Sequence, residues 1–428
     1  MPTESPVRSN STNMNLSPQP RFMLYSSFRH YLGVLFDVFT NQTQKGDDCL
    51  KLEEWVKRNC DTDYALCAPQ ARVAIYLAIK SATQEKKKII LSPYTIIDVV
   101  NMVICAGATP VFCDIEEETC NIDPEEAEKL IDSNTAGIMV THLHGLVGEL
   151  PIFKNICKRH NILLIEDAAQ ALGAKIEDRH AGTVGDIGIF SFGRYKHISS
   201  LYGGMLVTNK KSLHEKISNE YATFDATKKS KLLKRCIELS VKDLLTKTCL
   251  FQLLLFRIIR ISEKYDISFL KRIFGSENDL SIKEKIPSEY LEGLSESQAR
   301  MTINQLDQLK SNNLKRIENA TKYYQELKEN KAVGLPPWRE DMSHVYTYYP
   351  VQVKDREGLI RHLVASKRDA SIQHYKNCAD LDIFKRYYRD CPVARKVSNS
   401  TILLPTYPRY RKTEITKTCD QILSFINT

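Results

Sequence analysis

The sequence predicts an α/β protein with a mostly parallel sheet in a large domain, followed by a smaller α+β domain. Between residues 64 and 222, short apolar runs alternate with segments whose apolar positions recur at helical spacing. This alternation is typical of a parallel sheet that helices cover on both faces. From residue 286 the alternation gives way to a long amphipathic stretch, a β-prone segment and a closing helix. We therefore expect a second, smaller domain there.

The elements of the large domain can be assigned in chain order from their periodicity. The expected elements are a helix over 71–81, a strand over 89–91, a helix over 96–106, a strand over 109–114, a helix starting at 123, a strand over 137–140, a helix over 152–160, and strands over 162–165 and 187–192. Asp123 followed by Pro124 is typical of a helix cap and its first residue.

Composition divides the chain into four parts. Residues 1–21 are rich in Ser, Pro and Asn without periodicity, which predicts a disordered tail. The large domain is placed at 22–224, and its aromatic segment at 22–39 packs either on the body or on a dimer partner. A basic, apolar helical insertion is placed at 225–285. The small domain is placed at 286–428, with one long helix over 295–326, strands over 345–353 and 400–404, and helices over 357–366 and 413–427.

The net charge of +8 is concentrated in the insertion, since residues 228–272 hold twelve Lys/Arg and four Asp/Glu and the rest is balanced. Residues 244–261 are expected to form one helix, apolar most of the way round, that is too short and too rich in arginine to span a bilayer. Either this helix is buried against the body or a second subunit, or it lies in the interface of an anionic membrane. The surrounding charge favours the membrane. No recognised motif accompanies the charge, so nucleic-acid binding is not expected.

Cysteine usage and apolar runs indicate the compartment. The twelve cysteines are scattered singly, without a Cys-x-x-Cys pair or a Cys/His cluster at zinc spacing. Neither a metal site nor a disulfide framework is therefore expected. The sequence shows no signal peptide and no apolar run of about 20 residues. We expect a cytoplasmic protein, with peripheral contact at the inner face of the membrane through the insertion.

Candidate chemistry is concentrated between Ile165 and Lys196. Asp167 ends an apolar run, at the strand end where open α/β sheets place their ligands. Ser191 lies at the end of the next apolar run, and Lys196 follows shortly after it. A buried acid, a hydroxyl and a lysine at neighbouring strand ends are the groups that pyridoxal phosphate needs for its ring nitrogen, its phosphate and its covalent attachment.

These segments resemble the DegT/DnrJ/StrS sugar aminotransferases, which have the type I fold of pyridoxal phosphate enzymes. The resemblance covers about 62–224 and 286–428, and it rests on the segments IEDAAQALGA, GTVGDIGIFSFGRYK, HLHG, SESQARMTINQLDQLK, HYKNCADL and ILLPTYP. It implies that Lys196 forms the Schiff base and moves protons, that Asp167 pairs with the pyridine nitrogen, that Gln170 bonds the phenolic oxygen, and that Ser191 binds phosphate.

The resemblance also implies a reaction and its partners. We expect a pyridoxal phosphate-dependent aminotransferase that converts a keto sugar, carried on a nucleotide, to an amino sugar for a surface polysaccharide. Glutamate is the expected amino donor, and a homodimer with sites at the subunit interface is the expected assembly. Two alternatives remain: a cofactor-binding regulator or assembly component of the same fold, and a sugar dehydratase.

The sequence departs from the family around the cofactor. Where the family has a Gly-Thr or Gly-Ser pair at a helix start, this chain has Ala71 and Arg72. The helix N-terminus still offers N–H groups to an anion, and Arg72 either supplies a charge or is an exposed first-turn residue. Ile96 stands where the family often stacks an aromatic ring on the cofactor. We expect Ile96 to provide an apolar cover for the cofactor there, but aromatic stacking is lost unless Tyr94 reaches in.

Further departures concern the substrate. Tyr202 replaces an acidic residue, and Leu291 and Gly293 replace an Asn-x-Arg element that reaches the partner subunit. Because of these changes, the resemblance does not establish a nucleotide-sugar substrate, and a cofactor-binding regulator remains an alternative.

His142, His374 and Tyr94 are candidate substrate contacts, and His144 is a further candidate histidine of the site. His142 begins the HLHG segment, which corresponds to the family's His-Leu-Tyr-Gly element, and His374 matches a histidine near the substrate entrance. A structural role is equally compatible with each. Some relatives replace the lysine with histidine and become dehydratases. Here Lys196 is kept and His197 follows it, which favours transamination.

Overall fold

The structure is a computed structural model that describes residues 18–23, 26–265, 281–372 and 374–428. Residues 1–17 of the predicted tail lie outside this range. The end of that tail is packed: Pro18, Gln19 and Pro20 are buried. Arg21 forms an ion pair with Asp369 at 2.8 Å. The chain therefore joins the folded body by residue 18, earlier than the composition predicts.

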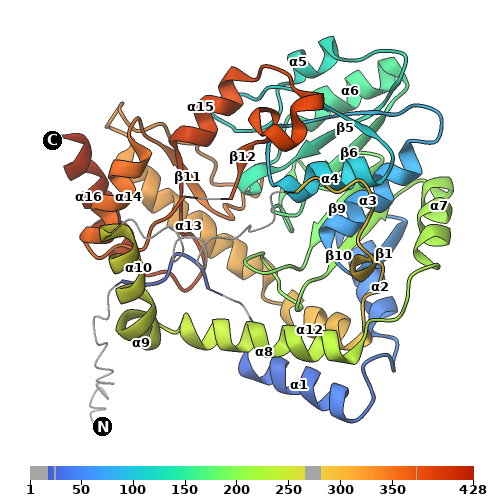
Figure 1. The fold of residues 1–428 in the computed structure, drawn as a ribbon, viewed down its shortest axis with the longest axis horizontal. Coiled ribbons are helices and arrows are strands. Elements are labelled where there is room, and N and C mark those ends of the chain that lie inside the picture. The colour runs from blue at the N-terminus through green and yellow to red at the C-terminus, as the bar shows by residue number, and fades with distance from the viewer. Residues whose placement is uncertain (1–17, 24–25, 266–280, 373) are drawn as a thin grey trace, which may run out of the picture.

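The large domain is built on one seven-stranded sheet (Figure 1). The strand order is β1 (Tyr64–Ala68), β10 (Gly204–Thr208), β9 (Ile187–Ser191), β6 (Leu163–Asp167), β5 (Thr135–Thr141), β2 (Lys88–Leu91) and β4 (Thr109–Phe112). The pairs from β9 through to β4 are parallel, and β10 is antiparallel to both of its neighbours. The predicted α/β class with a mostly parallel sheet is confirmed.

Helices cover both faces of the sheet, because the strands carry apolar side chains on each face. On one face, Ile165 packs with helices α3 (Ala71–Ala82), α4 (Ile97–Cys105) and α7 (Lys211–Tyr221). On the other, Leu164 packs with α2 (Asp48–Cys60), α5 (Pro124–Lys129), α6 (Leu150–His160) and α12 (Glu296–Leu306). Both faces of β6 and β9 are therefore buried, which fixes the position of their carboxyl ends. A short hairpin, β7 (Lys175–Ile176) and β8 (Arg179–His180), lies between β6 and β9 in the chain.

The small domain packs helices on a two-stranded antiparallel sheet, β11 (Tyr349–Gln352) and β13 (Thr401–Leu404). Its core is built mainly by α13 (Leu309–Leu327), α14 (Arg356–Ala365) and α16 (Lys412–Ile426). The prediction of one helix over 295–326 is wrong, because the helix ends at Leu306 and restarts at Leu309. The break has a packing reason: α12 contacts α2 of the large domain, whereas α13 contacts α16 of the small one.

One segment of the small domain returns to the large one. The two-residue strand β12 (Lys376–Asn377) pairs antiparallel with β3 (Tyr94–Thr95). Short helical turns η4 (Cys378–Asp380) and η5 (Asp382–Tyr387) and helix α15 (Pro392–Ser400) follow it. Two other turns, η1 (Leu143–Gly145) and η3 (Ser288–Tyr290), lie in connections. The pairing of β12 with β3 brings residues of both domains to the strand end of the sheet.

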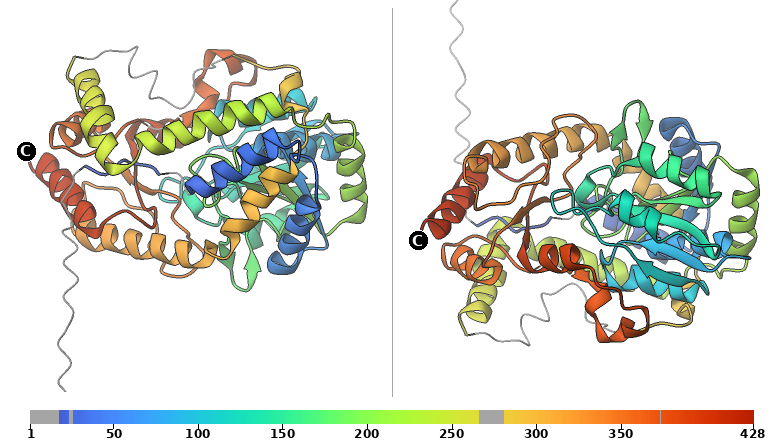
Figure 2. Two further views of the ribbon diagram at one scale, coloured as in Figure 1. Left: turned by 90° about the horizontal axis from the view of Figure 1, so that it is seen from below. Right: turned by 90° about the horizontal axis from the view of Figure 1, so that it is seen from above.

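The insertion runs along the molecule from the large domain to the small one (Figures 1 and 2). Helix α8 (Lys229–Leu245) packs on α1 (Phe28–Phe39), and α10 (Phe256–Lys264) packs on α14. Between them lie the short α9 (Thr248–Leu250) and a π-helical segment, η2 (Phe251–Leu255). The prediction of one helix over 244–261 is wrong, since the chain turns at Thr246 and Lys247. No helix among the described residues is long and apolar enough to cross a membrane.

Candidate active site

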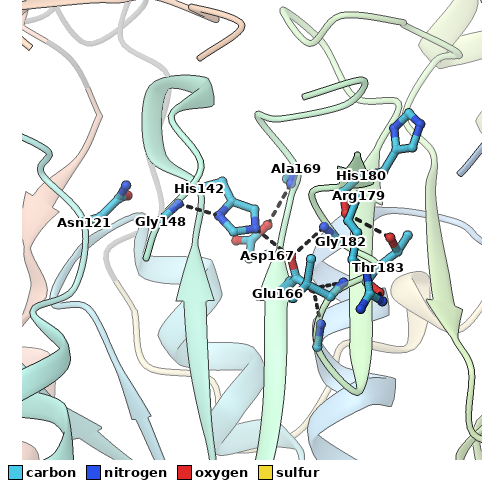
Figure 3. A network of polar contacts seen from close by, with 12 residues as sticks. Asn121, His142, Gly148, Glu166, Asp167, Ala169, Arg179, His180, Gly182 and Thr183 are labelled. Carbon is cyan, nitrogen blue, oxygen red and sulfur yellow. Dashed lines mark hydrogen bonds and ion pairs between the residues drawn. The ribbon is translucent and has the colours of Figure 1, made fainter. Parts of the chain in front are cut away.

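Two acidic residues end β6, and the strand's alternation sends them to different surroundings. Glu166 and Asp167 are both buried, and successive side chains of a strand point to opposite faces. Figure 3 shows Glu166 facing the backbone around Gly182, with Asp167 beside Ala169 and His142. The two carboxylates therefore differ in what they contact, although they share one strand end.

Glu166 is fully occupied by protein donors. Its carboxylate accepts hydrogen bonds from the backbone N–H groups of Gly182 at 2.7 Å, Val184 at 2.8 Å and Gly185 (Figure 3). The ring Nε2 of His142 lies 3.0 Å from the same carboxylate. Four donors satisfy a buried charge, so Glu166 anchors the loop that follows β8.

His142 is part of the same structural network. Its Nδ1 accepts a hydrogen bond from the N–H of Gly148 at 3.2 Å, which leaves the proton on Nε2 facing Glu166. The ring is fully buried. Both ring nitrogens have protein partners, so the structure places His142 behind the candidate site and not in contact with a substrate.

Asp167 and Lys196 form an electrostatic pair with unusual protonation properties. Burial raises the pKa of Asp167, although the hydrogen bond from the Ala169 N–H and the charge of Lys196 both oppose that rise. Burial lowers the pKa of Lys196 to about 8, and Asp167 partly counteracts this. The aspartate accepts its hydrogen bond from Ala169 at 3.1 Å. Both groups are thus shifted towards their neutral forms, which is typical of functional sites.

The loop that carries Lys196 is strained. Tyr195, Leu201 and Tyr202 have positive φ values of 61°, 57° and 72°, a conformation that costs roughly 1–2 kcal/mol for each residue with a Cβ. Several hydrogen bonds hold the loop in place. Phe192 and Gly203 are joined at 2.9 Å, and Gln298 donates to the carbonyl of Tyr202 at 2.5 Å. Such strain persists only where the surroundings fix it, and it is concentrated at functional sites.

A phosphate-sized anion would find donors beside Ser191. The Ser191 hydroxyl accepts a hydrogen bond from the Gly193 N–H at 3.2 Å, and Ser191 is paired with Gly204 across β9 and β10. A side chain on Gly204 would come within 2.6 Å of the Ala71 nitrogen, so glycine allows the first turn of α3 to approach this point. The N-terminus of α3 directs the positive end of its helix dipole towards this point.

Gln170 is oriented by the HLHG segment. Its side-chain oxygen accepts a hydrogen bond from the His144 N–H at 3.2 Å, so the amide NH₂ is the end left to donate elsewhere. His144 is fully buried with a positive φ of 58°, and neither ring nitrogen has a hydrogen-bond partner. Burial, with the charges of His374 and Lys196, lowers the pKa of His144 to about 3.

His374 and Tyr375, from the small domain, lie beside His144. The ring of Tyr375 lies 5.6 Å from His144 and 5.9 Å from Tyr94. Burial lowers the pKa of His374 to about 4, and the charges of Lys196 and Arg194 contribute to the same decrease. The structure therefore brings His374, His144 and Lys196 together, and both imidazoles are neutral near pH 7.

Three predicted residues lie differently from expectation. Arg72 forms an ion pair with Asp98 and lies 3.2 Å from the Tyr290 hydroxyl, so it is neither an exposed first-turn residue nor directed at Ser191. Ile96 packs against the core at the start of α4. The buried ring of Tyr94 packs against Tyr375 of the small domain, with ring centroids 5.9 Å apart. An apolar cover by Ile96 remains a prediction.

Three other residues at the site were not predicted from the sequence. Arg194 and Arg235 lie over the ring of Tyr202, with guanidinium carbons 5.2 and 4.8 Å from its centroid. Phe22 packs on Tyr195, with ring centroids 4.2 Å apart. Arg194 stands two residues before Lys196, and its position was a usable signal. Arg235 and Phe22 reach the site only through tertiary packing.

The donor set fits pyridoxal phosphate. A buried carboxylate with a raised pKa, a lysine with a lowered pKa, an oriented amide and a serine beside a helix N-terminus are grouped at one strand end. These groups match the ring nitrogen, the aldehyde, the phenolic oxygen and the phosphate of that cofactor. In the described part of the chain, no group of three or more His, Cys, Asp and Glu residues is placed to hold a metal ion.

Comparison with known proteins gives the same assignment. The profile of the DegT/DnrJ/EryC1/StrS aminotransferase family matches residues 37–234 and 272–423. GDP-perosamine synthase from Escherichia coli O157:H7 is 34% identical over 175 residues, which are 41% of this chain and 48% of that enzyme. The pleiotropic regulatory protein of Geobacillus stearothermophilus is 33% identical over 173 residues, or 40% of this chain and 46% of that protein. The matches thus span less than half of these curated relatives.

The fold has close counterparts among solved structures. Helicobacter pylori PseC, an aminotransferase involved in the biosynthesis of pseudoaminic acid, superposes with a TM-score of 0.73 at 21% identity. That likeness covers 96% of this chain and all of PseC. It supports the expected type I fold.

Proposed function

We propose, from the premise that this chain belongs to the DegT/DnrJ/EryC1/StrS aminotransferase family, that it is a pyridoxal phosphate-dependent aminotransferase acting on a keto sugar. The observation that carries the proposal is the pair of Asp167 and Lys196, whose pKa values are shifted in opposite directions at one strand end. Beside them lie Ser191 and the first turn of α3, which are suited to a phosphate group.

Pyridoxal phosphate, when bound, supplies an electron-withdrawing ring that stabilises negative charge on the substrate carbon. In our proposal the Asp167 carboxylate holds a proton on the ring nitrogen, which keeps the ring cationic. Gln170 donates its amide N–H to the phenolic oxygen, because its own oxygen is occupied by the His144 N–H. Ser191 and the N–H groups of α3 hold the phosphate.

Lys196 has two tasks in this proposal. Its amine is the attachment point of the cofactor, and a pKa of about 8 leaves a substantial neutral fraction near physiological pH. When the substrate amine has taken the place of Lys196, the freed Lys196 amine removes a proton from the substrate carbon and delivers that proton to another atom. A catalytic base with a pKa close to the working pH is suited to both directions of transfer.

The residues that contact the substrate are inferred from the histidines near Lys196. We propose that His144 and His374, neutral near pH 7, lie on the sugar side of the site, where each ring has one N–H donor and one acceptor nitrogen. The amino donor is glutamate and the keto sugar is nucleotide-linked, in line with a role in surface polysaccharide formation. The working assembly in this proposal is a homodimer, and sedimentation equilibrium measures it directly.

The first experiment is borohydride reduction followed by peptide mass spectrometry. We expect one reduced pyridoxyl phosphate adduct, on the peptide containing Lys196, and its loss in Lys196→Ala. Lys154→Ala is the matched control, since Lys154 is an exposed lysine on α6. An adduct that persists in Lys196→Ala would contradict the assignment of this lysine.

The second experiment separates the aminotransferase from its alternatives. Holoenzyme mixed with glutamate, without sugar, should lose the absorbance of the aldehyde form and release 2-oxoglutarate in a single turnover. A regulator of the same fold would release none with any amino donor. A dehydratase would give a keto-deoxy sugar without net amine transfer to it.

We also propose that the insertion rests on an anionic membrane surface. Its segment 251–261 docks one face on the small domain through Phe251, Phe256 and Ile259. The other face exposes Leu253, Leu254, Ile258 and Ile261 at 58%, 53%, 38% and 49%. Exposed Arg257, Arg260 and Lys264 flank these apolar side chains. Apolar groups ringed by cations suit an acidic lipid interface.

Flotation with liposomes tests this contact. We expect binding to vesicles that contain phosphatidylglycerol at low salt, weaker binding at high salt, and a marked loss in Leu253→Ser/Leu254→Ser. Ile152→Ser, on exposed α6, is the matched control. If the double variant changes the oligomeric state and leaves flotation unchanged, the face belongs to a second copy of the chain and the membrane proposal fails.

A further inference from the structure

Two cysteines that the proposed reaction does not use lie side by side at the edge of the large sheet. Cys49 is in the first turn of α2, and Cys67 is near the end of β1, the outermost strand. The Cys67 thiol donates a hydrogen bond to the Cys49 carbonyl at 3.6 Å, although the two residues are 18 positions apart in the chain. A hydrogen bond with the Cys49 side chain, followed by burial, raises the pKa of Cys67. Packing of α2 on β1 therefore brings the two thiols into contact.

The two thiols differ in their access to solvent. Cys49 is half-buried, whereas Cys67 is 2% exposed. A cavity of about 800 Å³ opens between α2, β1 and α7, and Leu50, Glu53 and Leu66 are in its lining. Leu50 and Leu66 are the direct chain neighbours of the two cysteines, so a small solute in this cavity comes close to the pair. Cys49 is the thiol that such a solute meets first.

A carboxylate is placed to receive the proton of the buried thiol. The Glu53 side chain accepts a hydrogen bond from the Cys67 N–H at 2.8 Å. Burial raises the pKa of Glu53, although hydrogen bonds from the backbone and the thiol of Cys67 oppose that rise. A thiol must lose its proton before its sulfur acts as a nucleophile. Glu53 contacts both the Cys67 thiol and the cavity, so it is suited to take that proton.

Cys49 also supports the segment that leads into α12. Its thiol donates to the Leu294 carbonyl at 3.8 Å, and its N–H donates to the Glu296 carboxylate at 2.9 Å. Gln298, which closes the capping box of α12, donates to the carbonyls of Ser200, Leu201 and Tyr202 in the strained loop that carries Lys196. The thiol pair is therefore connected to that loop through the first turn of one helix.

We propose that Cys49 and Cys67 are a reversible redox pair that a peroxide closes to a disulfide, and that closure loosens the support of the loop carrying Lys196. The Cys49 sulfur attacks one peroxide oxygen and becomes a sulfenic acid, while the thiol proton leaves with the other oxygen as water. The Cys67 sulfur then attacks the Cys49 sulfur and its proton passes to Glu53. The displaced hydroxide takes this proton and leaves as a second water. The two sulfur atoms lose two electrons, which reduce the peroxide, and a dithiol reverses the change.

Closure of the disulfide removes one contact at the start of α12. A disulfide sulfur carries no proton, so Cys49 no longer donates to the Leu294 carbonyl. The Leu294 N–H keeps its bond to the Tyr221 hydroxyl at 2.9 Å, and Glu296 keeps the Cys49 N–H. We therefore expect the segment 293–298 to loosen locally, without unfolding of the domain.

Peptide mass spectrometry of peroxide-treated holoenzyme tests the disulfide. Trypsin separates residues 46–51, which hold Cys49, from residues 59–72, which hold both Cys60 and Cys67. The measurement is therefore made in Cys60→Ser protein, with free thiols alkylated before digestion. We expect a cross-linked pair of these two peptides that is lighter than the reduced peptides by two hydrogen atoms and that dithiothreitol separates. The pair should be absent in Cys67→Ser.

Exposed Cys249 on α9 shows whether the peroxide dose was sufficient. Oxidised Cys249 without any link between Cys49 and Cys67 would overturn the proposal. In Glu53→Gln the link should form more slowly, by about ten-fold or more, because an amide cannot take the thiol proton. An unchanged rate in this variant would contradict the role of Glu53. A thermal melt of each variant controls for folding.

Hydrogen exchange measures the effect of closure on the loop. In the cross-linked protein, amide exchange at 293–298 and 199–203 should be about three-fold faster than in the reduced protein, as for loss of one hydrogen bond. Dithiothreitol should restore the slower rate, and exchange in α6 should be the same in both states. Unchanged exchange at both segments in a fully cross-linked sample would refute the connection to the loop.

Discussion

The two faces of β6 provide different numbers of hydrogen-bond donors to two neighbouring carboxylates, Glu166 and Asp167. On one side Glu166 accepts hydrogen bonds from the backbone N–H groups of Gly182, Val184 and Gly185 and from His142. On the other side Asp167 accepts one from Ala169, and burial raises its pKa. The first carboxylate has all the donors that it needs, and the second has room for a further positive partner.

This difference shows how a single strand can divide structure from function. A buried charge that protein donors satisfy fixes the fold around it, and removing it costs stability. A buried charge with few donors is kept at some cost in stability, and it is suited to a cationic ligand group. Changing each acid on β6 to its amide should therefore affect a different property: activity for Asp167 and stability for Glu166.

The largest effect is expected for Asp167→Asn. An amide cannot hold the positive ring nitrogen that we assign to this position, so kcat/KM should fall by about 10²–10³-fold, as for other preorganised electrostatic groups. The melting temperature of the cofactor-free protein should stay close to that of wild type or rise, because a partly unsatisfied charge has been removed. Steady-state kinetics and a thermal melt provide the two measurements. A stability loss with full activity would reverse the roles assigned to the two sides.

The next effect is expected for Glu166→Gln. One carboxylate oxygen becomes an NH₂ that faces backbone N–H groups, so buried donors lose their acceptor and unfolding becomes easier by about 3 kcal/mol. Urea denaturation of the cofactor-free variant measures this change. The activity of the fraction that remains folded should be far less affected than in Asp167→Asn. An unchanged urea midpoint would show that the Glu166 network does not anchor the loop at 182–185.

The smallest effect concerns the pH at which Lys196 becomes neutral. With a pKa of about 8, its amine loses its proton as the pH rises through 8, about two units before an ordinary lysine. Acetylation of Lys196 in cofactor-free protein by trace acetic anhydride, read by mass spectrometry, should rise with that midpoint. In Asp167→Asn the midpoint should move lower, because the aspartate charge raises the pKa. In Glu166→Gln it should stay in place, and exposed Lys154 provides the ordinary reference.

Strand ends were the part of the site that the sequence could predict. Asp167 and Ser191 each end an apolar run, and the carboxyl ends of parallel strands meet at one sheet edge, so their proximity to Lys196 followed from periodicity. The same reasoning predicted a mostly parallel sheet, but not the order of its strands. It could not separate the roles of His142 and His144, because the backbone turns at a positive φ of 58° between Leu143 and Gly145.

Breaks in helices and contacts from distant segments were not predictable. The amphipathic pattern continues through Asp307 and Gln308, yet α12 and α13 pack on different domains and the chain must bend there. The turn at Thr246 is set likewise by the docking of α8 on α1 and of α10 on α14. Arg235 reaches Tyr202 only because of that docking, and no local signal marks it.

The pairing of β3 with β12 has a consequence for biosynthesis. Tyr94 and Thr95 are made early, but their strand partner Lys376–Asn377 leaves the ribosome some 280 residues later. The seven-stranded sheet is complete by residue 208, so the large domain can form while translation continues. The edge of β3 and the rings of Tyr94 and His144 then lack their contacts with Tyr375 until the C-terminal segment arrives. A nascent chain stalled before residue 376 would accordingly be the species most in need of a chaperone.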